Sequence, residues 1–207
     1  MHKLIYFFLF SADARCIVSG SGSEMLQFTT FDKKNYKYAG VCKYSLVKDD
    51  VTNAFSVNVQ HSYVTPSTVA VKLVEVVVKT PDNSLVTVTM DTTLVAMVNG
   101  TAVTNGYKMA DVLVLDITSS TLTLTLLSAK VKVVVSSDGF TEVVASREWQ
   151  TRVSGLCGDY NEAAADDLTT RDGTVYTDAD KMADSLRVGG KCLCDKKVHI
   201  SSPTTYS

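Results

Sequence analysis

Threonine and leucine alternate through residues 121–126, and this period of two constrains the fold more than any other feature of the chain. Successive side chains of a β-strand point to opposite faces of its sheet. The pattern therefore predicts a strand with one solvated face and one packed face. Alternating or β-branched runs follow one another from about Phe28 to Trp149, so the chain is predicted to be mainly β.

Short stretches of turn-forming residues separate the predicted strands. We expect strands at residues 55–59, 69–78, 86–90, 95–98, 101–103, 111–118, 121–127, 130–135 and 141–145. Asn99 and Gly100 lie between two of these strands and tolerate the positive φ angles of a type I′ turn. They therefore predict a hairpin.

The last quarter of the chain is polar and rich in turn-forming residues. Residues 177–186 predict a short helix that Thr177 caps, with Asp180 at the third helical position. Gly189-Gly190 would end this helix. Residues 196–207 are polar, and we expect a disordered tail there.

The length and charge of the chain limit the kinds of partner. Its 207 residues fit one domain with short tails, and a hydrophobic content of 45% is enough for a sizeable core. The net charge is −2, and no run of lysine or arginine is longer than two residues. We therefore expect no nucleic-acid partner, because such proteins present a strongly basic face.

The N-terminus predicts a secretory signal peptide over residues 1–14. A weakly basic start precedes an apolar run at residues 4–10, and Ala12 and Ala14 offer a small-x-small cleavage site. The run is too short to cross a bilayer, which takes about 20 residues. We expect a secreted, extracellular protein without a transmembrane segment, whose mature chain begins at Arg15. The alternative is a buried N-terminal strand.

Secretion determines the expected chemical state of the five cysteines. Most cysteines of an extracellular protein form disulfides, so an odd number leaves one thiol for another chain or free. No zinc-binding spacing is present in the sequence, and the chain has only three histidines. The cysteines are Cys16, Cys42, Cys157, Cys192 and Cys194.

An acidic loop follows the third cysteine. Asp159, Asn161, Asp166 and Asp167 supply oxygen atoms within a short stretch, and an all-oxygen set suits Ca²⁺ better than zinc or copper. An EF-hand loop starting at Asp159 fails, because glycine and a bidentate glutamate are missing from their positions. The alternative is a solvated turn in which Asn161 caps a helix.

Three stretches of the sequence resemble the von Willebrand factor type D domain. They are Thr30-Phe31-Asp32 with Tyr36 to Leu46, then Val98-Asn99-Gly100, and last Gly155 to Asn161 with Asp166, Asp167 and Cys192. The resemblance implies an antiparallel β-sandwich over residues 15–195, with a short helical or loop segment at the C-terminal end. It also implies a calcium ion that joins the first stretch to the last.

The resemblance assigns roles to individual residues. The implied Ca²⁺ ligands are Asp32, Asp159, Asn161, Asp166, Asp167 and the backbone carbonyl of Ala163. The implied disulfides are Cys16–Cys157 and Cys42–Cys192, which leaves Cys194 for an intermolecular bond or as a free thiol.

The sequence departs from the family pattern at three places. Lys33 replaces a common glycine, and Ser154 stands where some mucin-like members have a cysteine. Without that cysteine, a disulfide-exchange role loses its chemical basis. Met25-Leu26-Gln27 replaces the Asp-Pro-His of many members, so the self-cleavage of some of them is not expected.

We expect a secreted, calcium-binding structural, adhesive or matrix-assembly module and not an enzyme. Its partners would be extracellular proteins or further copies of the chain. His61 is predicted to lie at a strand end and not to act as a base. Two alternatives remain open: a luciferase-like oxidase, and a secreted protein that binds a receptor or a lipid. Asn99-Gly100-Thr101 is a glycosylation sequon, and a turn chosen for its backbone geometry explains it equally well.

Overall fold

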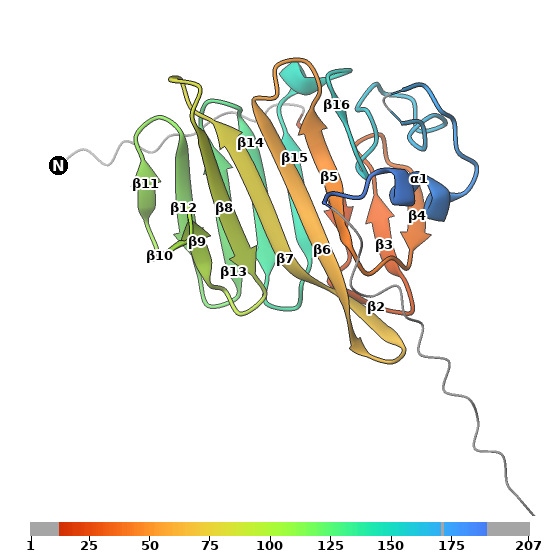
Figure 1. Ribbon diagram of the computed structural model, residues 1–207, viewed down its shortest axis with the longest axis horizontal. Helices are drawn as coiled ribbons and strands as arrows, with labels where there is room; N and C mark the ends of the chain where they lie inside the picture. The colour runs from red at the N-terminus through yellow and green to blue at the C-terminus, as the bar shows by residue number, and fades with distance from the viewer. Residues whose placement is uncertain (1–12, 171, 190–207) are drawn as a thin grey trace, which may run out of the picture.

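The computed structural model describes residues 13–170 and 172–189, which form two antiparallel sheets in a sandwich-like arrangement (Figure 1). The first sheet, sheet A, has eight strands in the spatial order β11 (Tyr107–Met109), β12 (Leu113–Ile117), β13 (Thr121–Leu126), β14 (Val131–Ser136), β15 (Thr141–Ala145), β1 (Ala14–Val18), β3 (Leu26–Thr29) and β4 (Asn35–Tyr38). The predicted mainly β, antiparallel sandwich is confirmed.

The second sheet, sheet B, is built around the two longest strands of the structure. Its order is β10 (Thr101–Val103), β9 (Ala96–Val98), β8 (Leu85–Asp91), β7 (Thr68–Lys79), β6 (Phe55–Thr65), β5 (Lys43–Asp49) and β16 (Val153–Ser154), with β2 (Ser21–Ser23) paired to β7. The far ends of β6 and β7 extend below the body of the sandwich, beside β2 (Figure 1).

The core lies between the two sheets, and the alternating sequence explains which side chains reach it. Leu122, Leu124 and Leu126 of β13 are fully buried, whereas the threonines between them are partly exposed. The neighbouring strand β14 buries Val131 and Val133 in the same way. Burying one such side chain contributes about 1.5–3 kcal/mol, so this alternation fixes both the register and the inward face.

The hairpin predicted at Asn99 and Gly100 is confirmed. The two residues connect β9 and β10 and have φ angles of 49° and 79°. Strand β6 is longer than the predicted segment 55–59, because residues 60–65 keep their pairing with β7 despite their polar side chains. The strand predicted at 111–118 begins only at Leu113, since Ala110 has a φ of 34° and turns the chain there.

Strand β1 lies outside the region where strands were predicted. It pairs with β15 from the other end of the chain and with β3, so it completes the middle of sheet A. The predicted cleavage after Ala14 falls on its first residue. Residues 1–12 lie outside the described part of the chain, and the leader at residues 1–14 stays a prediction.

The predicted C-terminal helix exists as α1 (Ala179–Ser185), but its cap is different. Asp178, and not Thr177, is the N-cap, because the Asp178 carboxylate accepts a hydrogen bond from the backbone N–H of Asp180 at 2.9 Å. Asp180 is therefore the second helical residue. Met182 and Ala183 are buried, on the side where α1 contacts β4.

No helix among the described residues is long and apolar enough to cross a membrane. The predicted tail at residues 196–207 and the end of the predicted domain at residue 195 lie outside the described residues.

Candidate metal centre

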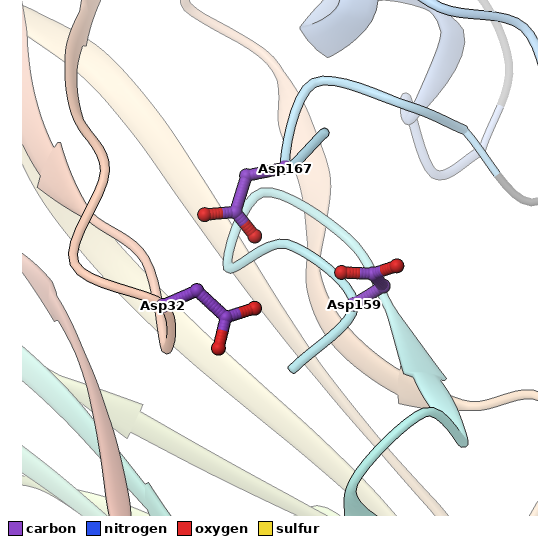
Figure 2. Close-up of side chains that lie close together, drawn as sticks. All are labelled: Asp32, Asp159 and Asp167. Carbon is purple, nitrogen blue, oxygen red and sulfur yellow. The ribbon is translucent and has the colours of Figure 1, made fainter. Parts of the chain in front are cut away.

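Three carboxylates from two distant segments meet at one end of the sandwich. Asp32 lies in the turn between β3 and β4, and Asp159 and Asp167 lie in the loop after β16. Each of the three offers an oxygen atom within 4.8 Å of the others. Figure 2 shows the three side chains converging on one space. We call them the carboxylate cluster.

Backbone and side-chain contacts hold the two segments together. The N–H of Phe31 donates to the carbonyl of Cys157 at 3.0 Å, and the Tyr36 hydroxyl donates to the carbonyl of Leu156 at 2.5 Å. The Lys34 ammonium donates to the carbonyl of Ala164 at 3.0 Å. The cluster therefore depends on contacts between the start and the end of the domain.

A disulfide joins the same two regions of the chain. Cys16 of β1 and Cys157 are bonded across a sequence separation of 141 residues, and both are fully buried. This is the pair that the family resemblance implied. Cys42 is also disulfide-bonded. Its predicted partner Cys192 lies outside the described residues, as does Cys194.

Hydrogen bonds between the two segments orient two of the three carboxylates. Asp32 accepts from the backbone N–H groups of Asn161 and Glu162, both at 2.9 Å, so it anchors the acidic loop directly. The Thr30 hydroxyl donates to one oxygen of Asp167 at 2.6 Å. Thr30 and Asp32 belong to one motif, and both are hydrogen-bonded to the same distant loop.

Several carboxylate oxygens in this loop are buried and have no hydrogen-bond partner. They are one oxygen each of Asp159, Asp166 and Asp167. A buried charged oxygen without a partner costs several kcal/mol unless a proton or a cation compensates it. Three such atoms lie in this one loop.

The pKa values agree with this interpretation. Burial raises the pKa of Asp167 to about 6, the Thr30 hydrogen bond opposes this effect, and the negative charges of Asp32 and Asp159 add to it. Burial also raises the pKa of Asp159, followed by the charge of Asp166. The fold thus holds carboxylates close together at a cost that a bound cation would remove.

Gly158 has two physical reasons to be glycine. Its φ of 78° is a left-handed conformation that other residues adopt at a cost. A Cβ atom at this position would lie 1.9 Å from an oxygen of Asp167, which leaves no room for it. The glycine after the cysteine therefore shapes the cluster.

The other predicted ligands lie beside the cluster. The Asn161 amide nitrogen donates to Asp159 at 2.9 Å and to Asp166 at 3.0 Å, while its oxygen accepts from the N–H of Ala163 at 2.7 Å. The Ala163 carbonyl accepts from the N–H of Asp166 at 3.2 Å. These two oxygens make turn hydrogen bonds, so their role as metal ligands stays a prediction.

Sequence reasoning gave no role to Thr30, Lys34 and Gly158. Thr30 and Gly158 belong to the motifs that predicted the site, so the sequence could have indicated that these two residues support it. Nothing in the sequence marks Lys34, because its contact with Ala164 depends on how two distant segments dock.

A second group of buried polar side chains lies in the core nearby, and the sequence did not predict it. We call Tyr38, Tyr44 and His61 the tyrosine–histidine cluster. The Tyr38 hydroxyl donates to that of Tyr44 at 2.6 Å, and the His61 ring lies 5.4 Å from the Tyr44 ring. Gly40 leaves the space for both hydroxyls, since a Cβ there would lie 2.0 Å from Tyr38 and 2.1 Å from Tyr44.

His61 was predicted at a strand end, and this is wrong. It lies inside β6, only 1% exposed, at a register shift against β7. Its Nδ1 is 3.1 Å from the carbonyl oxygen of Gly40, and its Nε2 has no hydrogen-bond partner. Burial lowers its pKa to about 4, so the ring is neutral at pH 7.

Comparison with known proteins agrees with the fold and the motifs. The sequence model of the von Willebrand factor type D domain matches residues 16–174. The chain belongs to this family. The type D domain therefore covers most of the described residues and includes every member of the carboxylate cluster.

Several curated proteins contain a region similar to this type D domain. Over 91% of its own length, the chain is 24% identical to mouse otogelin-like protein. It is 30% identical to bovine SCO-spondin over 87% of its own length, and 25% identical to mouse mucin-19 over 86%. It spans only 8%, 3% and 2% of these proteins respectively. The similarity therefore concerns one domain of much longer chains.

Proposed function

We propose that this type D domain binds Ca²⁺ in the carboxylate cluster and serves as a secreted structural module of an extracellular assembly. The observation that carries the calcium proposal is the set of partnerless buried oxygens of Asp159, Asp166 and Asp167. They belong to a loop that Asp32 reaches from the far end of the sequence.

The donor chemistry favours calcium. Ca²⁺ takes six to eight oxygen ligands in a flexible arrangement and accepts several carboxylates, whereas Mg²⁺ keeps most of its waters. Asp32, Asp159 and Asp167 would hold the ion, with Asp166 and Asn161 next to them. A bound Ca²⁺ supplies positive charge that offsets the repulsion between these carboxylates. The protein residues align the two segments through the Thr30 and Lys34 contacts.

The structural role is supported by the similarity of the chain to one region of long proteins that include SCO-spondin and mucin-19. In this chain, the hydrogen bonds of Asp32 to Asn161 and of Thr30 to Asp167 link the first and last parts of the domain, as the Cys16–Cys157 disulfide does. These links would support a structural role. We therefore propose extracellular proteins or further copies of the chain as its partners.

The calcium proposal is tested by thermal unfolding and by calorimetric titration of the protein stripped with a chelator. At a Ca²⁺ concentration of 100 times Kd, the ion would stabilise the fold by about 2.7 kcal/mol. For a domain of this size this raises Tm by about 5–10 °C. An unchanged Tm together with no heat of binding would refute the proposal.

Two variants and a control make the test specific to the cluster. Asp32→Asn and Asp167→Asn each remove one charge from it, and both should lose most of the Ca²⁺-dependent rise in Tm. The control is Asp116→Asn, at an exposed position of β12, where the carboxylate has no hydrogen bond or ion pair among the described residues. It should keep the full response.

The assembly proposal needs a separate measurement. Sedimentation and a non-reducing gel of the secreted protein, compared with Cys194→Ser, distinguish a disulfide-linked dimer from non-covalent association. A covalent dimer that persists in Cys194→Ser would exclude Cys194 as the bridge. A protein that remains a monomer at all concentrations, with or without Ca²⁺, would contradict self-assembly and leave other extracellular proteins as the partners.

A further inference from the structure

Two Asn-Gly turns flank the short edge strand β10. Both glycines have a positive φ, but of the two asparagines only Asn99 does. Asn99-Gly100 precedes β10 and Asn105-Gly106 follows it. Gly100 and Gly106 both have a φ of 79°. The side-chain oxygen of Asn99 accepts from the N–H of Thr87 at 2.9 Å, and that of Asn105 accepts from the N–H of Ile117 at 2.8 Å.

A side-chain hydrogen bond to a backbone N–H thus accounts for the asparagine at both places, but it does not account for Thr101. The residue two positions after Asn105 is Tyr107, whereas Asn99 is followed at this position by threonine. Asn99, Gly100 and Thr101 are all exposed. Only the first turn therefore combines an exposed asparagine with the hydroxyl that N-glycosylation requires.

We propose that Asn99 carries an N-linked glycan, which covers the β9–β10 edge of sheet B. The proposal rests on the secretory route in the proposed function and is independent of calcium. The donor is an oligosaccharide joined to a lipid through pyrophosphate. The Nδ2 of Asn99 forms a bond to C1 of the first sugar, the bond from C1 to the phosphate oxygen breaks, and the lipid pyrophosphate leaves. Nδ2 loses one proton in this step.

The local structure is compatible with the product. The side-chain nitrogen of Asn99, Nδ2, has no hydrogen-bond partner among the described residues. The side-chain oxygen keeps its contact with the N–H of Thr87 when a sugar is attached to Nδ2. The space beside the turn is open, because a Cβ built on Gly100 meets no atom within 4 Å. The glycan can therefore be attached without disturbing the hairpin.

The position of the turn suggests what the glycan does. β10 is the outermost strand of sheet B, at the edge of the sandwich (Figure 1). Thr101 and Ala102 are exposed on it, and Met97 of β9 is 39% exposed. An open strand edge with apolar neighbours promotes pairing with other chains. A glycan at Asn99 would block this edge and leave the end with the carboxylate cluster accessible.

The test is production of the full chain behind an added cleavable secretion signal in insect cells. Protein from the medium is weighed by mass spectrometry before and after enzymatic glycan removal. Wild type should lose the mass of one glycan, while Asn99→Asp and Thr101→Val should show no change. Both variants keep the hairpin, because aspartate retains an oxygen for the Thr87 contact and valine retains the β-branched shape.

A matched positive control is Tyr107→Thr, which completes a sequon at the second turn. If this variant carries a glycan and wild type does not, the proposal is overturned. Edge coverage is tested by sedimentation of the wild-type protein with and without its glycan. Self-association that increases after glycan removal is expected, and an unchanged monomer would overturn the covering role of the glycan.

Discussion

The carboxylate cluster and the tyrosine–histidine cluster both bury polar side chains near β3 and β4, but their chemistry is opposite. The first collects anionic groups, and three oxygens of its acidic loop have no partner. The second consists of neutral side chains, in which the Tyr38 hydroxyl is hydrogen-bonded to that of Tyr44 and also lies 3.2 Å from a carboxylate oxygen of Asp184. In the first cluster a bound cation would offset the repulsion between the carboxylates, whereas in the second burial lowers the pKa of His61 to about 4 and the ring is neutral at pH 7.

This difference shows how similar degrees of burial lead to different functions. A neutral hydroxyl pair costs little once it is hydrogen-bonded, so the two tyrosines can lie in the core without a ligand. If the carboxylate cluster binds Ca²⁺ as proposed, the ion offsets the repulsion between the carboxylates, and the cluster would couple stability to a ligand. The following variants separate the two clusters, in order of decreasing effect.

Removal of the disulfide beside the carboxylate cluster should have the largest effect. Replacing both Cys16 and Cys157 by alanine releases a loop closed across 141 residues, which should lower the free energy of unfolding by about 4–5 kcal/mol. Urea unfolding in saturating Ca²⁺ measures the loss. A loss below about 1 kcal/mol would show that the remaining contacts alone hold the two segments.

A pair of glycine substitutions compares the clusters directly. Gly158→Ala places a Cβ against Asp167 in a left-handed conformation, and Gly40→Ala places one against Tyr38 and Tyr44. Each should cost about 1–3 kcal/mol of stability. Only Gly158→Ala should also abolish the Ca²⁺-dependent rise in Tm. Equal calcium responses in the two variants would contradict the separation of the clusters.

The two clusters should respond to pH in opposite directions when calcium is removed. Asp167 has a pKa raised from 3.8 to about 6, so its contribution to stability is present below pH 4 and is lost as the pH rises through 6. His61 has a pKa lowered from 6.5 to about 4, so its contribution is present above pH 6.5 and is lost as the pH falls to 4. The two effects partly cancel in wild type.

Urea unfolding in chelator between pH 4 and pH 7 separates these effects. Asp167→Asn should reduce the loss on alkalinisation, to which Asp159 also contributes through its raised pKa, and His61→Gln should reduce the loss on acidification. Adding Ca²⁺ should suppress the loss of stability on alkalinisation and not the loss on acidification. Parallel pH profiles of the two variants would show that other groups dominate this range.

The smallest effect is expected at Lys33. Its φ of 72° places a non-glycine residue in the left-handed region next to Asp32. Lys33→Gly removes a strain of about 1–2 kcal/mol but adds backbone freedom worth about 0.5–1 kcal/mol to the unfolded chain. A net gain of about 0.5–1 kcal/mol is expected in thermal unfolding. A loss of stability would mean that the lysine side chain makes a compensating contribution.

Local features of the sequence were enough for the strands and for the motifs of the site. The alternation at residues 121–126, the turn at Asn99 and the order of the family motifs depend only on neighbouring residues, so they are readable without coordinates. The helix near residue 180 was predicted, but its cap was placed at Thr177 and not at Asp178. Either side chain can cap a helix, and which one does so depends on how α1 docks.

The sequence by itself determined a mainly β chain, its type D family and the acidic residues available for a metal. Only the tertiary structure decided which oxygen atoms meet, that Lys34 and Thr30 support them, and that His61 is buried inside a strand. The physical reason is distance along the chain. Propensity and periodicity act over a few residues, whereas burial and the proximity of charges arise from contacts between segments more than a hundred residues apart.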